Sequence, residues 1–223
     1  MGSTSGGMAG ILIEPVGGTR FGVTYQSEIE LDFKDRPKTN NLGPLLSDAL
    51  DISGLTGAKV DLGLTIPNQV MVSAYHDVTD TIAIVGNIVW QQWSQFGQPT
   101  LEVTSTTSRD ATTDLDYNDT WGLSIGGRYR FAPDWLWSVG FAYDTSPMSK
   151  SQRTPAMPLD RQIRVGTGVQ YALNERATLG AAYEYLNLGD ADLERSRPLA
   201  GTLQGDYSTN EIHFFNATLS WKL

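Results

Sequence analysis

Histidines 76 and 213 are the side chains best suited to acid–base or metal chemistry, because the chain contains no cysteine. A catalytic triad or dyad needs a histidine held against a serine or a carboxylate in a defined geometry, and neither His76 nor His213 stands in such a motif. A zinc site needs several ligands at regular spacing, and no cluster of His, Asp and Glu has that spacing. The sequence therefore predicts no catalytic residue, no metal and no cofactor.

Recognition of a carboxylate by arginine is a second possible chemistry. The planar guanidinium can bind a carboxylate through two parallel hydrogen bonds, and Arg128, Arg130 and Arg164 are candidates for this role. The alternative is that these arginines form a network of paired charges that stiffens a wall. The other charged residues with the same strand phase are Glu28, Glu30, Asp32, Asp144, Glu184 and Lys222.

The elements that must position these arginines are strands of alternating polarity. Residues 21–33 read FGVTYQSEIELDF, which places apolar side chains on one face and polar or acidic ones on the other. Residues 121–131, 135–146, 161–173 and 208–223 alternate in the same way, and aromatic residues lie near many strand ends. This pattern is typical of a transmembrane β-barrel, with apolar rows toward lipid, polar rows toward a lumen and aromatic girdles at the interfaces.

The chain divides into about nine strands, and short and long connections alternate between them. The short turns fall at 16–19, 77–80, 132–134 and 174–176, and the long loops at about 35–58, 105–116, 147–160 and 188–207. Short periplasmic turns and long extracellular loops are the arrangement of outer-membrane barrels. The predicted strands are 8–15, 20–34, 59–76, 81–104, 117–131, 135–146, 161–173, 177–187 and 208–223.

Composition excludes several classes of protein. The net charge of −9 and the lack of a basic cluster argue against a nucleic-acid partner. The mean hydropathy is −0.25, and no stretch approaches the roughly 20 apolar residues of a spanning helix. The first ten residues, MGSTSGGMAG, have neither the basic nor the apolar region of a signal peptide.

The number of strands carries an expectation about the whole barrel. If the last strand ends in the periplasm, an odd count makes the first strand run the same way, whereas single-chain bacterial barrels have an even number. We therefore expect residues 1–223 to be one segment of a larger barrel, without its first strands. Alternatively, residues 8–15 lie outside the wall and the remaining eight strands close alone around a filled interior.

Loop 35–58 and Pro67 are the two irregular features. The loop carries apolar residues at three- and four-residue spacing, as on a short amphipathic helix; they are Leu42, Leu45, Leu46, Ala49, Leu50 and Ile52. This helix either covers its own loop or offers a landing surface for hydrophobic ligands. Pro67 removes a ladder donor within a predicted strand, which indicates a bulge or a local opening in the wall.

An ordered set of segments resembles the outer-membrane family of long-chain fatty acid and aromatic hydrocarbon transporters (FadL/TodX). The resemblance covers essentially the whole chain, and no single motif decides it. The segments are FGVTYQSEIELDF (21–33), TIPNQVMVSAY (65–75), WQQWSQF (90–96), FAYDTSP (141–147) and PLDRQIRVGTGVQYALN (158–174). Leu223 departs from the family's terminal aromatic residue, although Trp221 lies close by.

The resemblance implies an all-β, antiparallel barrel of fourteen strands with an N-terminal hatch in its lumen. The strands here would be the last nine, and the hatch and first five strands would have no counterpart. Loop 35–58 would form part of the family's outer hydrophobic groove.

The function that the resemblance implies is passive uptake of hydrophobic compounds across the bacterial outer membrane. The expected partners are fatty acids, hydrocarbons, and lipid or detergent, and the protein is expected to be monomeric. The ligand-binding candidates are Leu42, Leu45, Leu46, Leu50, Ile52, Arg128, Arg130 and Arg164. The alternatives are a structural or adhesive barrel, an outer-membrane hydrolase that uses His213, and a soluble lipid carrier.

Overall fold

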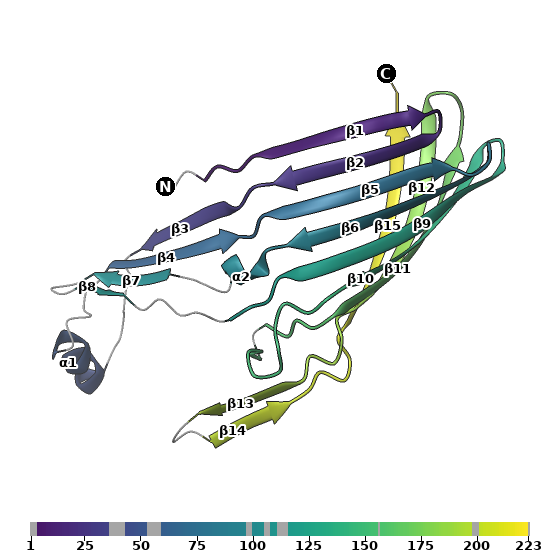
Figure 1. Cartoon of the computed structure of the whole chain (residues 1–223). Helices are drawn as coiled ribbons and strands as arrows, with labels where there is room; N and C mark the ends of the chain where they lie inside the picture. Colours follow the sequence, from purple (N-terminus) through teal and green to yellow (C-terminus); the bar gives the residue numbers. More distant parts are fainter. Residues whose placement is uncertain are drawn as a thin grey trace.

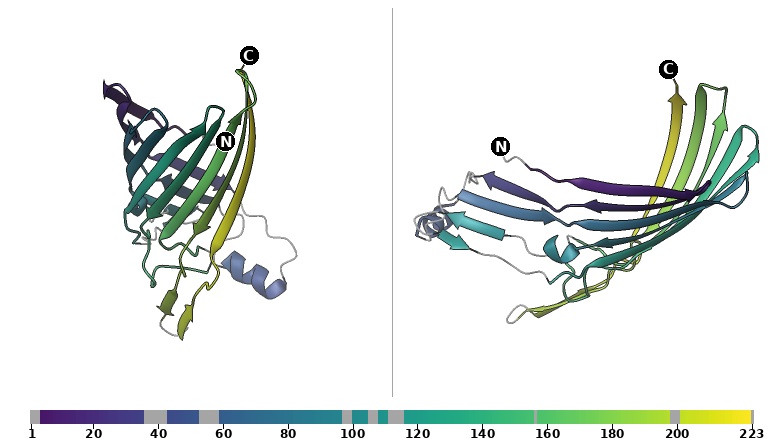
Figure 2. Two further views of the ribbon diagram at one scale, coloured as in Figure 1. Left: turned by 90° about the vertical axis from the view of Figure 1, so that its right-hand side faces the viewer. Right: turned by 45° about the horizontal axis from the view of Figure 1, so that its top comes forward.

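The fold is a curled antiparallel sheet (Figures 1 and 2). The computed structural model describes residues 4–35, 43–52, 59–96, 100–104, 108–110, 116–155, 157–197 and 201–222. Within them, nine strands pair in the order β1-β2-β5-β6-β9-β10-β11-β12-β15, which confirms the predicted all-β antiparallel class. The strands are β1 (Met8–Val16), β2 (Thr19–Gln26), β5 (Gln69–Asp77), β6 (Ile82–Gln91), β9 (Thr120–Ala132), β10 (Trp135–Asp144), β11 (Gln162–Ala172), β12 (Ala177–Asn187) and β15 (Glu211–Trp221).

The sheet is open in the described part of the chain, where β1 and β15 form its two edges. Each strand pairs with its neighbour in an unbroken register over most of its length; β10 and β11, for example, pair from Trp135 with Tyr171 to Asp144 with Gln162. This ladder satisfies the backbone hydrogen bonds within the sheet, as a spanning structure in lipid requires. The alternative of eight strands that close alone is not what the structure shows, because β1 pairs with β2 within the wall.

Smaller elements lie beyond the strand ends, on the side away from the short turns (Figure 1). A four-stranded sheet has the order β3-β4-β7-β8, and β13 pairs with β14 in a separate hairpin. No helix among the described residues is long and apolar enough to cross a bilayer. These elements are β3 (Ile29–Asp35), α1 (Pro44–Ile52), β4 (Lys59–Ile66), α2 (Trp93–Phe96), β7 (Thr100–Thr104), β8 (Ser108–Asp110), β13 (Leu193–Arg197) and β14 (Gly201–Gly205).

Three of the predicted long strands are interrupted, all at the same level of the wall. Residues 20–34 divide into β2 and β3, residues 59–76 into β4 and β5, and residues 81–104 into β6, α2 and β7. Pro67 and Asn68 separate β4 from β5, and the Gln92 amide donates to the Asn68 carbonyl oxygen at 3.1 Å. Proline cannot donate to a ladder, so the strand ends where Pro67 stands. Loop 188–207 also contains the β13–β14 hairpin, which the sequence analysis missed.

The two faces of the sheet differ as their alternation predicts. Large apolar side chains stand exposed on one face, among them Ile125, Phe141 and Leu219. Near the short turns this face carries a continuous aromatic band, in which the ring of Trp135 lies 4.5 Å from that of Tyr171 and 5.9 Å from that of Phe131. An exposed apolar face bordered by aromatic rings suits lipid and would be a liability in water.

A charge placed on this face tests its environment. Ile125 is 62% exposed near the middle of β9, and we expect Ile125→Lys to cost about 2–4 kcal/mol of unfolding free energy in lipid. Ala142→Lys, at a similar depth on the polar face, should cost much less. Denaturant unfolding in lipid vesicles measures both variants, and equal costs would contradict the assignment of the faces.

Candidate functional site: a lumen-side hollow and a loop collar

A hollow of about 770 Å³ lies against the polar face of β6, β9, β10, β11, β12 and β15. Its floor is low because glycines meet across neighbouring strands: Gly140 pairs with Gly126 on β9 and with Gly166 on β11. A β-carbon on Gly140 would come no closer than 3.7 Å to its surroundings, so larger residues would fit the backbone here but would fill the hollow.

Polar side chains surround this floor. The Asn87 amide donates to Ser124 Oγ at 2.5 Å, and Arg164 Nη2 donates to Asp144 Oδ2 at 2.5 Å. Arg164 Nε is buried without a hydrogen-bond partner in the described part of the chain. Arg128 and Glu184 also line the hollow. Part of the predicted network of paired charges is therefore present, and Arg164 is not fully used by it.

The three candidate arginines do not share one site. Arg128 and Arg164 both line the hollow, whereas Arg130 Nη1 lies 3.5 Å from the Pro133 carbonyl oxygen at the β9–β10 turn. Arg128 and Arg164 stand on β9 and β11, and β10 lies between them.

The predicted amphipathic helix corresponds to α1, which begins at Pro44 and ends at Ile52. The side chains of Leu45 and Ile52 are 89% and 87% exposed. Leu42 lies outside the described residues, as do the side chains of Leu46 and Leu50.

The two histidines are held by hydroxyl groups. His76 Nδ1 lies 2.9 Å from Thr19 Oγ1, and His213 Nδ1 lies 2.8 Å from the Tyr183 hydroxyl. His213 Nε2 also lies 3.6 Å from Glu211 Oε1. Among the described residues, no group of three or more His, Cys, Asp and Glu residues could hold a metal ion.

A ladder of glutamine amides crosses the polar face at the level where the strands are interrupted. Gln69 Nε2 donates to Gln26 Oε1 at 3.4 Å, and Gln91 Nε2 donates to Gln69 Oε1 at 3.0 Å. Gln91 Oε1 accepts in turn from the indole N–H of Trp93 in α2 at 3.2 Å and from Thr120 Oγ1 at 3.4 Å. The ladder thus ties α2 to strands β2, β5, β6 and β9.

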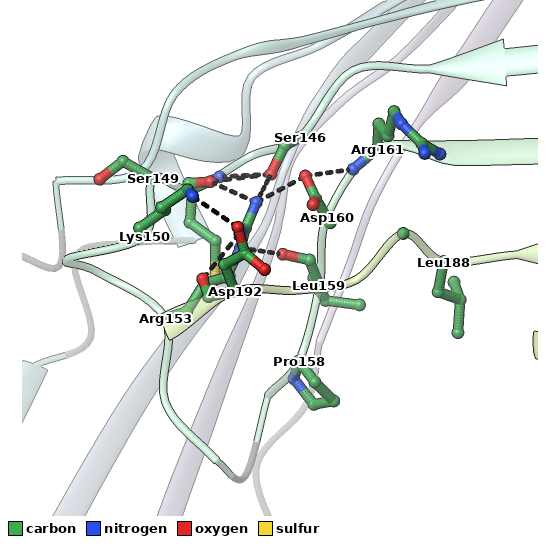
Figure 3. A network of polar contacts seen from close by, with 12 residues as sticks. Ser146, Ser149, Lys150, Arg153, Pro158, Leu159, Asp160, Arg161, Leu188 and Asp192 are labelled. Carbon is green, nitrogen blue, oxygen red and sulfur yellow. Dashed lines mark hydrogen bonds and ion pairs between the residues drawn. The ribbon is translucent and has the colours of Figure 1, made fainter. Parts of the chain in front are cut away.

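The loops outside β10, β11 and β12 meet around one buried arginine, Arg153, which is 4% exposed (Figure 3). Its Nε donates to the Leu159 carbonyl oxygen and its Nη1 to the Asp192 carbonyl oxygen, both at 2.8 Å. Its Nη2 contacts Asp160 Oδ1 at 2.5 Å and Ser146 Oγ at 3.2 Å. Burying a guanidinium is costly unless it is paired and hydrogen-bonded, and here each of its three nitrogens has an acceptor.

Loop 188–192 takes a tight shape where it meets Arg153. Gly189 has φ +71° and Ala191 has φ +45°, and Ala191 is fully buried. A β-carbon on Gly189 would lie 2.8 Å from Asp160 Cβ. At the surface of the same contact, Lys150 Nζ lies 2.5 Å from Asp192 Oδ2. The two loops are therefore joined by a buried hydrogen bond, from Arg153 to the Asp192 carbonyl oxygen, and by an exposed ion pair.

The connection between β6 and β9 joins the same assembly. The Asn118 amide donates to the Pro147 carbonyl oxygen at 2.7 Å, and the buried Tyr117 donates its hydroxyl to Met157 Sδ at 3.6 Å. The Tyr117 ring stacks on Phe96 of α2 with 6.4 Å between centroids. We call residues 93–96, 116–119, 145–160 and 188–193 the collar.

Arg153 was not predicted from the sequence, although two of its partners lie in segments with a recognisable pattern. Ser146 and Asp160 belong to the segments FAYDTSP and PLDRQIRVGTGVQYALN that carried the family resemblance. The signal was that two polar motifs flank one loop, but alternation says nothing about contacts between loops. Only the fold shows that these motifs converge on an arginine between them.

The curled antiparallel sheet, its apolar outer face with an aromatic band and its polar hollow define a protein of the transmembrane β-barrel class. A family model described as "Outer membrane protein transport protein (OMPP1/FadL/TodX)" matches residues 3–220. The chain belongs to this family, whose members are outer-membrane transport proteins and not enzymes.

Named relatives and solved structures agree with this assignment. A long-chain fatty acid transport protein of Escherichia coli O6:H1 is 29% identical over 186 residues, covering 80% of this chain and 41% of the relative. Outer membrane protein P1 of Haemophilus influenzae is 25% identical over 179 residues, covering 80% of this chain and 37% of the relative. The chain thus spans about two fifths of the length of these relatives.

The structural neighbours show the same fold. A FadL homologue of Pseudomonas aeruginosa superimposes with a TM-score of 0.80 at 23% identity, covering 96% of this chain and 51% of that one. The toluene transporter TodX of Pseudomonas putida gives a TM-score of 0.60 at 17% identity, covering 97% of this chain and 48% of that one.

Filling the glycine floor tests whether the hollow holds a ligand. We expect Gly140→Leu to weaken the binding of a hydrophobic ligand by about tenfold or more, because a clash in a packed site costs roughly 1–3 kcal/mol. Gly86→Leu is the matched control, since Gly86 pairs with the outward-facing Ile125 and does not line the hollow. Titration with a fluorescent fatty acid measures both variants, and an equal effect of the two would exclude the hollow.

The exposed ion pair of the collar predicts a flat response to pH near neutrality. A hydrogen bond to Lys150, and then its charge, hold the pKa of Asp192 below its ordinary value, and the same contacts raise the pKa of Lys150. The Asp192 contribution to stability is present above its ordinary pKa and is lost as pH falls through the lowered one. The Lys150 contribution is present below its ordinary pKa and is lost as pH rises through the raised one.

Hydrogen exchange of loop 188–192, corrected for the intrinsic rate, should therefore stay constant between about pH 5 and pH 9. A marked acceleration between about pH 5 and pH 7 would show that another group controls this loop.

Proposed function

We propose that the protein is a passive outer-membrane channel for hydrophobic compounds, either long-chain fatty acids or aromatic hydrocarbons. The observation that carries the proposal is the hollow on the polar face, whose floor is bare backbone and whose rim bears two arginines. Support also comes from membership of a transport family and from relatives named for fatty acid and toluene transport.

The route that we propose starts at α1 and ends in the lumen. The exposed Leu45 and Ile52 lie seven residues apart, and this spacing puts them on one helix face that can adsorb an apolar ligand. Leu42, Leu46 and Leu50 belong to the same proposed landing surface. The ligand then passes the collar and enters the hollow. No step of this route requires energy coupling.

The open edges of the sheet support a larger barrel. In the described part of the chain, the outer edges of β1 and β15 have no strand partner, and unpaired backbone groups would be costly in lipid unless further strands pair with them. We propose that the nine strands are the last nine of a fourteen-stranded, monomeric barrel, and that a hatch segment occupies its lumen. The interruption at Pro67 would then lie at the end of the lipid-facing strands away from the short turns, where a local opening in the wall can let ligand pass.

For a fatty acid, the carboxylate would bind Arg128. Arg128 lines the hollow, while Arg164 already donates to Asp144 and would contribute only its remaining N–H groups. An arginine–carboxylate contact is bidentate and charge-assisted, so it suits recognition of an acid headgroup at the polar rim. A neutral hydrocarbon would fill the same hollow without this contact.

Neutralising Arg128 tests the ligand class. For an acid ligand, we expect Arg128→Gln to weaken binding by about tenfold, because a hydrogen bond to a charged group contributes roughly 1.5–3 kcal/mol. Binding of toluene should not change. The matched control is Arg130→Gln, two residues along the same strand face but outside the hollow. If Arg128→Gln and Arg130→Gln behave alike, Arg128 is not the headgroup site.

Transport itself is tested in cells that make the protein and in otherwise identical cells that lack it. We expect faster uptake of radiolabelled long-chain fatty acid or of toluene only when the protein is present, with no accumulation above the external concentration. Equal uptake in the two strains for both compounds would refute the proposed function.

A further inference from the structure

We propose that Arg153 is a positioning residue of the collar, which forms the extracellular mouth of the channel. Arg153 holds the loops that follow β10 and β12 against each other. These loops support the aromatic rings of α2 and Tyr117, which we call the aromatic shelf. The inference rests on the proposed transport function, since it assigns Arg153 a role in capturing the ligand. Arg153 itself stays buried and does not touch the ligand.

The contacts of Arg153 reach across the chain in three directions. Nε donates to the Leu159 carbonyl oxygen within its own loop, and Nη1 donates to the Asp192 carbonyl oxygen in the loop after β12. Nη2 contacts Ser146, in the loop just after β10, and Asp160, just before β11. A lysine could keep the charge beside Asp160, but a single ammonium group cannot reproduce this fork.

The backbone around Arg153 is shaped for the same contact. Gly189 and Ala191 have positive φ values of +71° and +45°, a backbone conformation that residues other than glycine rarely adopt. Gly189 also leaves room for Asp160, whose Cβ would lie 2.8 Å from an added β-carbon. The strained turn thus brings the Asp192 carbonyl oxygen to Arg153 and keeps Asp160 in reach, which is independent evidence that the junction is built.

The loops that Arg153 holds together support the aromatic shelf. Met157 accepts the Tyr117 hydroxyl, and the Pro147 carbonyl oxygen accepts the Asn118 amide. Tyr117 stacks on Phe96, which in turn meets Trp93 edge-on with 5.3 Å between centroids. The glutamine ladder fixes the other side of Trp93 through its indole N–H. The shelf is therefore held between the barrel wall and the Arg153 loops.

Loss of Arg153 should loosen the mouth and leave the barrel intact. The strands keep their own ladders, so the saturated rate of transport should be unchanged. The mouth, however, would be in its capture-competent arrangement for a smaller part of the time. If that fraction falls to about a tenth, the apparent affinity for the incoming ligand falls about tenfold.

The experiment compares Arg153→Met, Arg153→Lys and Gly189→Ala with the unmodified protein in its own outer membranes. Uptake of a radiolabelled long-chain fatty acid and of toluene is measured against concentration, and hydrogen exchange is followed in residues 145–160 and 188–193. The matched control is Lys150→Met, which removes the exposed ion pair between the same two loops. Heat-dependent mobility on gels shows whether each variant has assembled its barrel.

We expect Arg153→Met to raise the half-saturating concentration about tenfold at an unchanged maximal rate, with faster exchange in both loops. Arg153→Lys should recover part of the affinity, and Lys150→Met should behave like the unmodified protein. Gly189→Ala deletes no hydrogen-bonding group and should also raise the half-saturating concentration. If Arg153→Met fails to assemble, the result for Gly189→Ala tests the inference in its place.

Faster loop exchange with an unchanged half-saturating concentration would overturn the inference while the transport function stands. A fall in the maximal rate alone, with normal affinity, would overturn it as well. Failure of the unmodified protein to take up either compound would instead refute the proposed function and, with it, this inference.

Discussion

The pairing register of the antiparallel ladder is the constraint on which the rest of the structure depends. Side chains alternate between the two faces of a strand, so a slip of one residue would turn every apolar row inward and every polar row outward. Over ten residue pairs between β10 and β11 no such slip occurs. The lipid-facing surface, the glycine floor and the positions of Arg128 and Arg164 all follow from this register.

Alternation made the wall of this protein readable from its sequence. The pattern in 121–131 and 161–173 placed Arg128 and Arg164 on the face opposite the apolar rows, and both line the hollow. The short turns were equally clear, because each joins neighbours in the sheet. The amphipathic spacing in loop 35–58 likewise predicted α1, since a helix face leaves a signal within one segment.

The parts that escaped prediction depend on contacts between segments distant in sequence. The interruption at Ser27 and Glu28 has no strong local signal, but it lies level with Pro67 on a neighbouring chain segment. Arg153 could not be distinguished from a solvated loop residue, because three of its acceptors are backbone carbonyl oxygens, those of Leu159, Asp192 and, at 3.4 Å, Met148. Every residue of any sequence has a backbone carbonyl oxygen, so composition and motif spacing cannot predict which of them a side chain will contact.

The glutamine ladder gives the mouth a property that the arginine-lined hollow lacks. Its links are hydrogen bonds between neutral groups, from Thr120 and Trp93 through Gln91 and Gln69 to Gln26. Neutral amides neither titrate nor attract counterions, whereas exposed charges are screened within a Debye length of about 8 Å at physiological salt. The glutamine ladder therefore keeps its hydrogen bonds at low and at high salt alike, whereas the attraction that we propose between Arg128 and an acid headgroup weakens as the salt concentration rises.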